Sequence, residues 1–135
     1  MLSRLSDFRP NLMQLDLLRS CLLSGPPALA AWKRWKSRVD LSRIDDASFR
    51  LWPLLAHNLH KEGIGDPDFG LYRGAQRRSW MRNQQLFFSL RNLLDDLRAR
   101  GWNPYLLKGV ALATSVYPNA GLRPMHDLDI WLPAE

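Results

Sequence analysis

Two aspartates near the end of the chain are the residues whose type and spacing point most directly to chemistry. Asp127 and Asp129 lie one residue apart in the apolar run DLDIWL, which is bounded by Pro124 and Pro133. Branched and aromatic residues in such a run predict a short strand. Alternate side chains of a strand share one face, so the two carboxylates should point the same way, roughly 6.5 to 7 Å apart along the strand.

This pair of carboxylates is a candidate metal site. Like charges so close repel one another unless a cation lies between them, and hard oxygen ligands suit Mg²⁺ or Mn²⁺ better than zinc. A second interpretation stays open, because two aspartates at this spacing also occur on the solvent face of an amphipathic edge strand. The pair by itself does not separate the two interpretations.

The segment before the aspartates predicts a strand, a turn and a helix. Residues 105–107 are apolar, follow the breaker-rich sequence GWNP, and indicate a strand that ends at Lys108 and Gly109. Residues 110–116 then have helical character. The expected order is therefore strand, glycine turn, short helix and strand.

This order resembles the nucleotidyltransferase superfamily, whose hallmark is a glycine turn after a first strand and two aspartates on a second. Within it, the sequence LLKGVAL, followed by Tyr117, the G-x-R of residues 121–123 and DLDI, is most similar to the bacterial family of uncharacterised nucleotidyltransferases. In that family a helical segment precedes this core. The likeness covers about residues 105–132.

The resemblance implies an activity and a metal cofactor. By this likeness Asp127 and Asp129 are the catalytic pair and hold Mg²⁺ or Mn²⁺, and the reaction transfers a nucleotidyl group from a nucleoside triphosphate (NTP) to a hydroxyl acceptor. Two divalent ions would then clamp the attacking and leaving oxygens of an in-line displacement. The acceptor is not specified by the sequence.

The resemblance also implies a nucleotide-binding set, formed by Lys108, Gly109, Val110 and Arg123. A turn rich in N–H groups at a helix start favours anions, and a residue without Cβ permits close approach of a phosphate. Lys108 and Arg123 would contact the triphosphate or position the carboxylates. In the alternative, Arg123 forms a structural ion pair with an aspartate.

The chain departs from the superfamily pattern in one important respect. The superfamily takes a third carboxylate from a later strand, and this chain ends at Glu135, which is too close to Asp129 to come from another strand. We therefore expect a core truncated after the second strand, with little activity in this chain alone. The alternative function is a non-catalytic module that binds a nucleotide or a partner. The open edge of so small a sheet also favours self-association.

Composition limits the remaining possibilities. A length of 135 residues with 46% hydrophobic content and six Trp fits one domain with a packed core. Cys21 is the one cysteine and lies in an apolar helical pattern, which predicts a buried, inert thiol. No signal peptide or membrane-spanning stretch is visible, so we expect a cytoplasmic protein without a membrane partner.

The first hundred residues predict a helical array. Leucines at three- and four-residue steps indicate a first helix, before Gly25, with a stripe formed by Leu12, Leu15, Leu18, Leu22 and Leu23. A second helix is expected over residues 27–39. A third should start at Asp45 or Asp46 and end at Gly63 or Gly65, with Phe49, Trp52, Leu55 and Leu59 on one face and Pro53 in its first turns.

The longest expected helix starts at Asp66 or Asp68 and stops at Gly101. Its apolar stripe comprises Leu86, Leu90, Leu93, Leu94 and Leu97. We therefore predict an α+β chain, with a helical region over residues 1–100 and a partial nucleotidyltransferase core of a mixed sheet over residues 101–135. The two parts should form one compact unit.

Positive charge is concentrated in the helical region. Residues 1–100 hold 17 Lys and Arg against 10 Asp and Glu, a balance of +7, whereas residues 101–135 hold 2 against 3, a balance of −1. Arg73, Arg77, Arg78 and Arg82 surround Trp80. Such a cluster could follow a nucleic-acid backbone, or it could be an ordinary solvated helix face.

Overall fold

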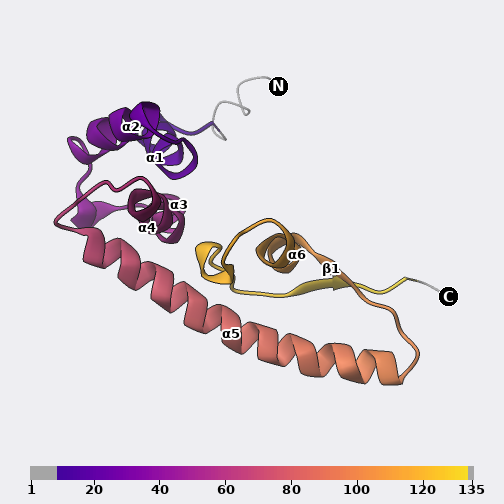
Figure 1. The fold of residues 1–135 in the computed structure, drawn as a ribbon. Coiled ribbons are helices and arrows are strands. Elements are labelled where there is room, and N and C mark those ends of the chain that lie inside the picture. Colours follow the sequence, from indigo (N-terminus) through magenta and orange to yellow (C-terminus); the bar gives the residue numbers. More distant parts are fainter. Residues whose placement is uncertain (1–8, 134–135) are drawn as a thin grey trace.

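The computed structural model describes residues 9–133, which form helices and one small sheet (Figure 1). The elements are α1 (Leu12–Leu22), α2 (Pro26–Lys36), the 3₁₀ turn η2 (Leu41–Arg43), α3 (Asp46–Phe49), α4 (Trp52–Lys61), α5 (Phe69–Ala99), β1 (Tyr105–Leu107), α6 (Lys108–Ser115), the 3₁₀ turn η3 (Ala120–Leu122) and β2 (Asp129–Trp131). The predicted α+β class is confirmed.

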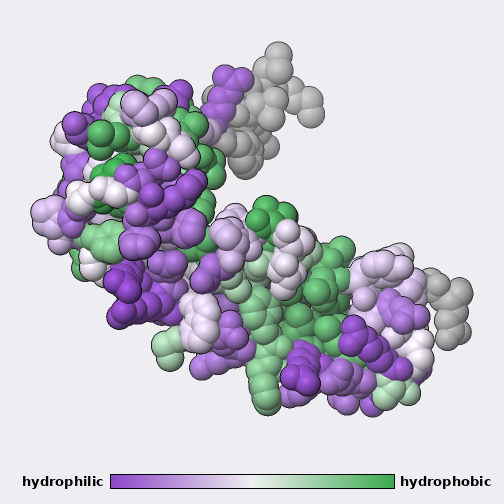
Figure 2. Space-filling view, in the orientation of Figure 1, coloured by the Kyte–Doolittle hydropathy of each residue, from purple (hydrophilic) through white to green (hydrophobic). Residues whose placement is uncertain are grey.

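The long helix α5 connects two hydrophobic clusters. Figure 1 shows α1 to α4 gathered beside its first turns, while α6 and the two strands lie along its second half. The first cluster joins α1, α2 and α4 to the start of α5, and the second joins α5 to α6 and the segment before β2. In Figure 2 hydrophobic residues gather where α6 lies over α5. The helix therefore fixes the distance between the two parts.

Aromatic side chains dominate the first cluster. Trp32, Trp35 and Trp52 surround the fully buried Tyr72 of α5, with ring centroids 5.1 to 6.3 Å from that of Tyr72. These tilted and edge-on arrangements are the favourable ones for aromatic pairs. They attach α5 firmly to α2 and α4.

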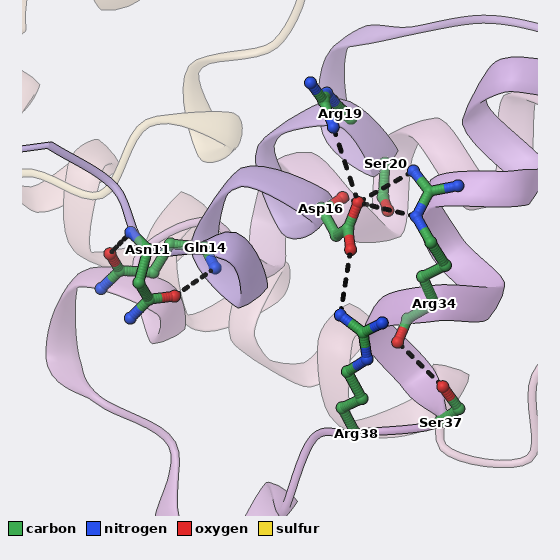
Figure 3. A network of polar contacts seen from close by, with 8 residues as sticks. All are labelled: Asn11, Gln14, Asp16, Arg19, Ser20, Arg34, Ser37 and Arg38. Carbon is green, nitrogen blue, oxygen red and sulfur yellow. Dashed lines mark hydrogen bonds and ion pairs between the residues drawn. The ribbon is translucent and has the colours of Figure 1, made fainter.

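Helix α1 forms as predicted, but it buries a different face. The buried residues are Asp16, Leu17, Ser20 and Cys21, whereas the predicted stripe includes Leu12 and Leu22, which are exposed. The buried carboxylate of Asp16 accepts hydrogen bonds from Nε and Nη2 of Arg34 on α2, at 3.0 and 2.9 Å. Figure 3 shows Arg19 and Arg38 approaching the same carboxylate. This neutralisation lets a charged residue occupy a buried position, which the leucine pattern alone does not reveal.

The Asp16 network predicts a pH-dependent stability. The hydrogen bond from Arg34 lowers the pKa of Asp16 below its ordinary value of 3.8, more strongly than burial raises it. Because the folded-state pKa is depressed, the stabilisation is present above the unfolded-state pKa and is lost as the pH falls through the folded-state pKa. Asp16→Asn should cost about 1 to 3 kcal/mol at pH 7, and the difference should shrink as the pH falls below the ordinary pKa of 3.8 and through the lower folded-state pKa. Urea unfolding at several pH values checks this; a constant difference across the range would contradict it.

The third predicted helix is two helices. Asp45 caps α3 by accepting a hydrogen bond from the Ser48 amide at 2.9 Å, as predicted, but α3 ends at Phe49 and α4 begins at Trp52. Pro53 has no N–H and its ring clashes with the carbonyl four residues earlier, so it starts a new helix more readily than it continues one. The break places Arg50 in the bend between the two helices.

Helix α5 has the predicted extent, and Gly101 follows it with φ +84°. Leu90 of its predicted stripe is buried, and Leu86 and Leu94 pack against the second cluster. Leu93 is 43% exposed, so its place in the stripe was predicted wrongly. The packed face is centred on Leu90, Phe87 and Leu94, and Leu93 lies beyond its edge on the helical wheel.

The sheet consists of β1 and β2, which pair antiparallel, with Tyr105 opposite Trp131 and Leu107 opposite Asp129. The strand over residues 105–107 is confirmed. The second strand is shorter than predicted and begins at Asp129, so Asp127 precedes it in irregular backbone and the alternation of a strand does not place its side chain. Glu135 lies outside the described residues.

Cys21 is buried, and burial raises the pKa of its thiol to about 12, as expected for an inert cysteine. Among the helices of residues 9–133, none combines the length and apolar character needed to cross a membrane.

Candidate functional site

One small pocket brings together most of the residues singled out from the sequence. It has a volume of about 370 Å³ and lies beside the turn from β1 into α6. Its lining includes Lys108, Gly109, Arg123, Asp127 and Asp129. Residues 21 positions apart in the chain thus meet because β1 and β2 pair side by side.

The two aspartates enter the pocket from the start of β2. Asp129 is the first residue of the strand, and its side chain is 35% exposed. Asp127 is exposed and forms no ion pair with any residue in the described range 9–133. Two carboxylates that line one pocket provide the oxygen ligands that a hard divalent cation prefers. In residues 9–133 no group of three or more His, Cys, Asp or Glu side chains is placed to hold a metal.

Lys108 connects the turn to the aspartates. Its Nζ lies 3.3 Å from Oδ1 of Asp129, and its side chain is 73% exposed. An ion pair so exposed contributes little stability, about 0 to 1 kcal/mol, so the lysine can exchange its partner readily. Lys108 also has φ +50°, a left-handed conformation that is strained for a residue with a Cβ. Such strain is typical of functional turns.

The first turn of α6 presents backbone N–H groups near the pocket. Leu107 caps this helix without a side-chain hydrogen bond, and the first N–H groups of a helix have no intrahelical partner. The side chain of Val110 is buried in the second cluster, with Leu90 and Met125, and is not part of the pocket lining. Any contribution of Val110 to binding would therefore come from its N–H.

Nothing in the described chain sterically requires a glycine at position 109. A Cβ there would lie 3.5 Å from the side chain of Met125 and 3.7 Å from Nε of Arg123, which are ordinary contacts, and its φ is not positive. All three residues line the pocket. A Cβ would therefore occupy space that a ligand could use.

Arg123 places its guanidinium beside the start of α6. Its Nε is buried without a hydrogen-bond partner among the described residues, and Arg123 forms no ion pair within that range. The structural ion pair considered for this arginine is thus not seen in residues 9–133. A guanidinium next to the positive end of a helix dipole is unfavourable by itself, and both favour an anion between them.

Sequence reasoning missed Asn83, which holds the segment that carries Arg123. Asn83 is fully buried on α5, and its Nδ2 donates to the carbonyls of Ala120 and Arg123 at 2.6 and 2.8 Å. The signal available in the sequence is its position seven residues before Leu90, on the same face of the helix. A polar residue on an apolar stripe indicates a buried hydrogen-bonding role.

Gly121, in the G-x-R sequence, has a packing role. A Cβ at this position would lie 2.8 Å from Cβ and 3.2 Å from Cα of Trp80, because η3 packs directly on α5. The absence of a side chain therefore allows the close approach that lets Asn83 reach the backbone of η3.

We expect replacement by alanine to have different effects on stability at Gly121 and Gly109. Gly121→Ala should lower the free energy of unfolding by about 1 to 3 kcal/mol, because the added methyl group overpacks the contact with Trp80. Gly109→Ala should change it by about 0.5 kcal/mol or less. Urea unfolding of both variants measures this. Equal effects at the two positions would show that η3 does not pack on α5 as described.

A larger pocket adjoins the first. Its volume is about 1130 Å³, and it lies between α3, the middle of α5 and the segment before β2. The two pockets share Arg50, Pro124, Met125 and His126. Arg78 and Arg82 of the predicted arginine cluster line it, whereas Arg73 and Arg77 do not, so the cluster is divided between helix faces.

Comparison with known proteins identifies a family that covers the region of the smaller pocket. A family model described as "Uncharacterised nucleotidyltransferase" matches residues 47–135, which include every described residue that lines the smaller pocket. Neither the search of curated proteins nor the search of solved structures found a match.

Proposed function

Since the chain belongs to the uncharacterised nucleotidyltransferase family, we propose that its smaller pocket binds an NTP with Mg²⁺ or Mn²⁺ for nucleotidyl transfer to a hydroxyl acceptor. The observation that carries the proposal is the convergence of Lys108, Gly109, Arg123, Asp127 and Asp129 on that one pocket. Cationic groups and free N–H groups meet two carboxylates there. A metal-bound triphosphate complements both kinds of group.

The carboxylates would serve as the metal ligands. Asp127 and Asp129 are oxygen donors, and between them they supply two negative charges to a cation. When bound, the divalent ions supply Lewis-acid stabilisation of charge on the attacking and leaving oxygens. Lys108 now pairs with Asp129 and would exchange that partner for a phosphate oxygen, since its side chain is long and exposed.

The turn and the arginine would hold the triphosphate. Gly109 and Val110 contribute N–H groups at the start of α6, where the helix dipole favours an anion. Gly109 leaves room for close approach, so Gly109→Ala, with its small expected effect on stability, should weaken triphosphate binding. The hydrogen bonds from Asn83 fix the backbone carbonyls of Ala120 and Arg123, and so the segment from which the Arg123 side chain projects.

The second candidate function is a non-catalytic module that binds nucleotide or a partner. The described lining of the smaller pocket contributes two carboxylates, Asp127 and Asp129. In-line attack also needs the acceptor hydroxyl to be ordered and deprotonated, which is the task of a further carboxylate in the superfamily. For catalysis, this further carboxylate would have to come from outside the described residues, for example from a second copy of the chain.

We therefore expect this chain by itself to bind NTP with Mg²⁺ but not to turn it over at an appreciable rate. Loss of a general base lowers a rate by about 10² to 10⁴. Incubation of the chain with labelled NTPs and Mg²⁺ measures transfer. Sizing of the same sample should show association through the open edges of the β1–β2 pair.

Metal-dependent transfer that is lost in Asp129→Asn would contradict this expectation. It would mean that a proton acceptor is present within the chain or across a dimer. The concentration dependence of the rate then separates the two, because transfer across a dimer disappears on dilution.

A further inference from the structure

The larger pocket has a composition that suits a particular kind of ligand. Apolar side chains of Phe49, Pro53, Met81 and Met125 form much of its lining. Aromatic and methionine side chains provide an adaptable apolar surface. Such a surface favours a ligand with an apolar body over a sugar or another strongly hydrated molecule.

The charged groups of this pocket are mostly cationic. Arg50, Arg78 and Arg82 line it, and Asp46 is the single acidic residue in its described lining. None of the three arginines forms an ion pair with a described residue. Arg78 and Arg82 lie four positions apart on α5 and therefore on the same face, where they can hold one carboxylate between them.

A further polar group in the lining also lacks a partner. Ser79 is more than nine-tenths buried, and its hydroxyl forms no hydrogen bond with a described residue. Buried hydroxyl groups are normally paired, so this one is consistent with a polar group supplied by a ligand. The unpaired hydroxyl of Ser79 therefore indicates a polar ligand group separately from the positive charge of the arginines.

The position of the pocket suggests what the ligand does. Arg50, Pro124, Met125 and His126 line both pockets, so the two pockets adjoin along these residues. A molecule in the larger pocket that extends from Arg78 and Arg82 to His126 would have its second end next to the residue that precedes Asp127 in the chain. This is the arrangement that an acceptor requires, since its hydroxyl must reach the α-phosphorus of a bound NTP.

We propose that the larger pocket binds the acceptor, and that this acceptor is a small molecule with an apolar body, an acidic group and a hydroxyl at the opposite end. The inference rests on the proposed function of the smaller pocket. In the transfer, the hydroxyl oxygen forms a bond to the α-phosphorus while the bond from that phosphorus to the bridging oxygen breaks. Pyrophosphate leaves with the bonding electron pair, and the hydroxyl proton passes to water.

The test uses 6-hydroxy-2-naphthoate, a fluorescent molecule of this description, and its uncharged methyl ester. The acid should bind the full chain with an affinity at least about tenfold higher than the ester, because charge-assisted hydrogen bonds to arginine are lost in the ester. The double variant Arg78→Gln and Arg82→Gln should lose this preference. Arg91→Gln, an exposed arginine on α5 outside both linings, is the matched control and should keep it.

Equal binding of the acid and the ester, or no binding of either, would overturn the proposal. Both outcomes are measured on the unmodified chain, so they do not depend on whether the double variant folds. The acid should also stay bound when ATP and Mn²⁺ are added at saturation. Displacement by ATP would assign the larger pocket to the nucleoside and overturn the acceptor role. ATP and Mn²⁺ binding is measured separately in the absence of the acid, so a failure there counts against the smaller pocket and removes the basis of the acceptor role.

Discussion

Replacing Asp127 and Asp129 together by Asn should abolish the stabilisation of this chain by Mn²⁺. A ligand that binds the folded state at one hundred times its dissociation constant raises the free energy of unfolding by about 2.7 kcal/mol. Asn has no charge to offer a hard cation, so the variant should show no shift. Thermal unfolding with and without Mn²⁺, alone and with ATP, measures the effect.

The matched control replaces Asp95 and Asp96 by Asn. These residues are also two nearby carboxylates, but they lie exposed on α5 away from both pockets. The control should respond to Mn²⁺ as the unmodified chain does. Without metal, the Asp127 and Asp129 variant should fold normally, because removing two like charges relieves repulsion. An undiminished Mn²⁺ response in that variant would place the metal elsewhere in the chain.

Asn83→Ala should be the most damaging single change near the site. It removes both N–H donors to the partly buried carbonyls of Ala120 and Arg123, and each group left unsatisfied costs about 1 to 3 kcal/mol. We expect a loss of about 2 to 4 kcal/mol in the free energy of unfolding. Asn83→Asp should be no better, because an ionised carboxylate offers acceptors where donors are needed.

The comparison for this prediction is Asn92→Ala, at an exposed position of the same helix, which should cost about 0.5 kcal/mol or less. Under conditions where Asn83→Ala remains folded, its affinity for ATP with Mn²⁺ should also fall, since Arg123 loses its fixed position. A loss of stability with unchanged ATP binding would show that Asn83 supports the fold and does not position the pocket.

The short-range features of this protein follow from its sequence alone. The order strand, helix and strand, the cap at Asp45, and the end of α5 before Gly101 depend on residues within a few positions of one another, although α6 begins at Lys108 and so includes the two residues predicted to form a separate turn. The division of the third predicted helix at Pro53 is also a short-range feature, because the missing N–H and the ring clash are local properties of proline. We nevertheless predicted a single helix there. The sequence also identified the family, because its motif residues cluster within residues 105–132.

Which helix faces are buried was decided by tertiary structure. Asp16 can be buried because Arg34 of α2 and Arg38, which follows that helix, come to it, and Leu93 is exposed because the packed face of α5 is centred elsewhere. A leucine pattern specifies an amphipathic helix, but the partner helices choose the face. The division of the chain at residue 100 stays a prediction, and both hydrophobic clusters include residues of α5.

The contacts that bring the site residues together were likewise decided by tertiary structure. Arg123 reaches the start of α6 because Asn83, forty positions earlier, holds the η3 segment, and because Gly121 allows η3 to approach Trp80 closely. The larger pocket arises because the bend at Arg50 and the middle of α5 face the segment before β2. Contacts between residues so far apart depend on how complete elements pack, so they appear only when the whole chain is folded.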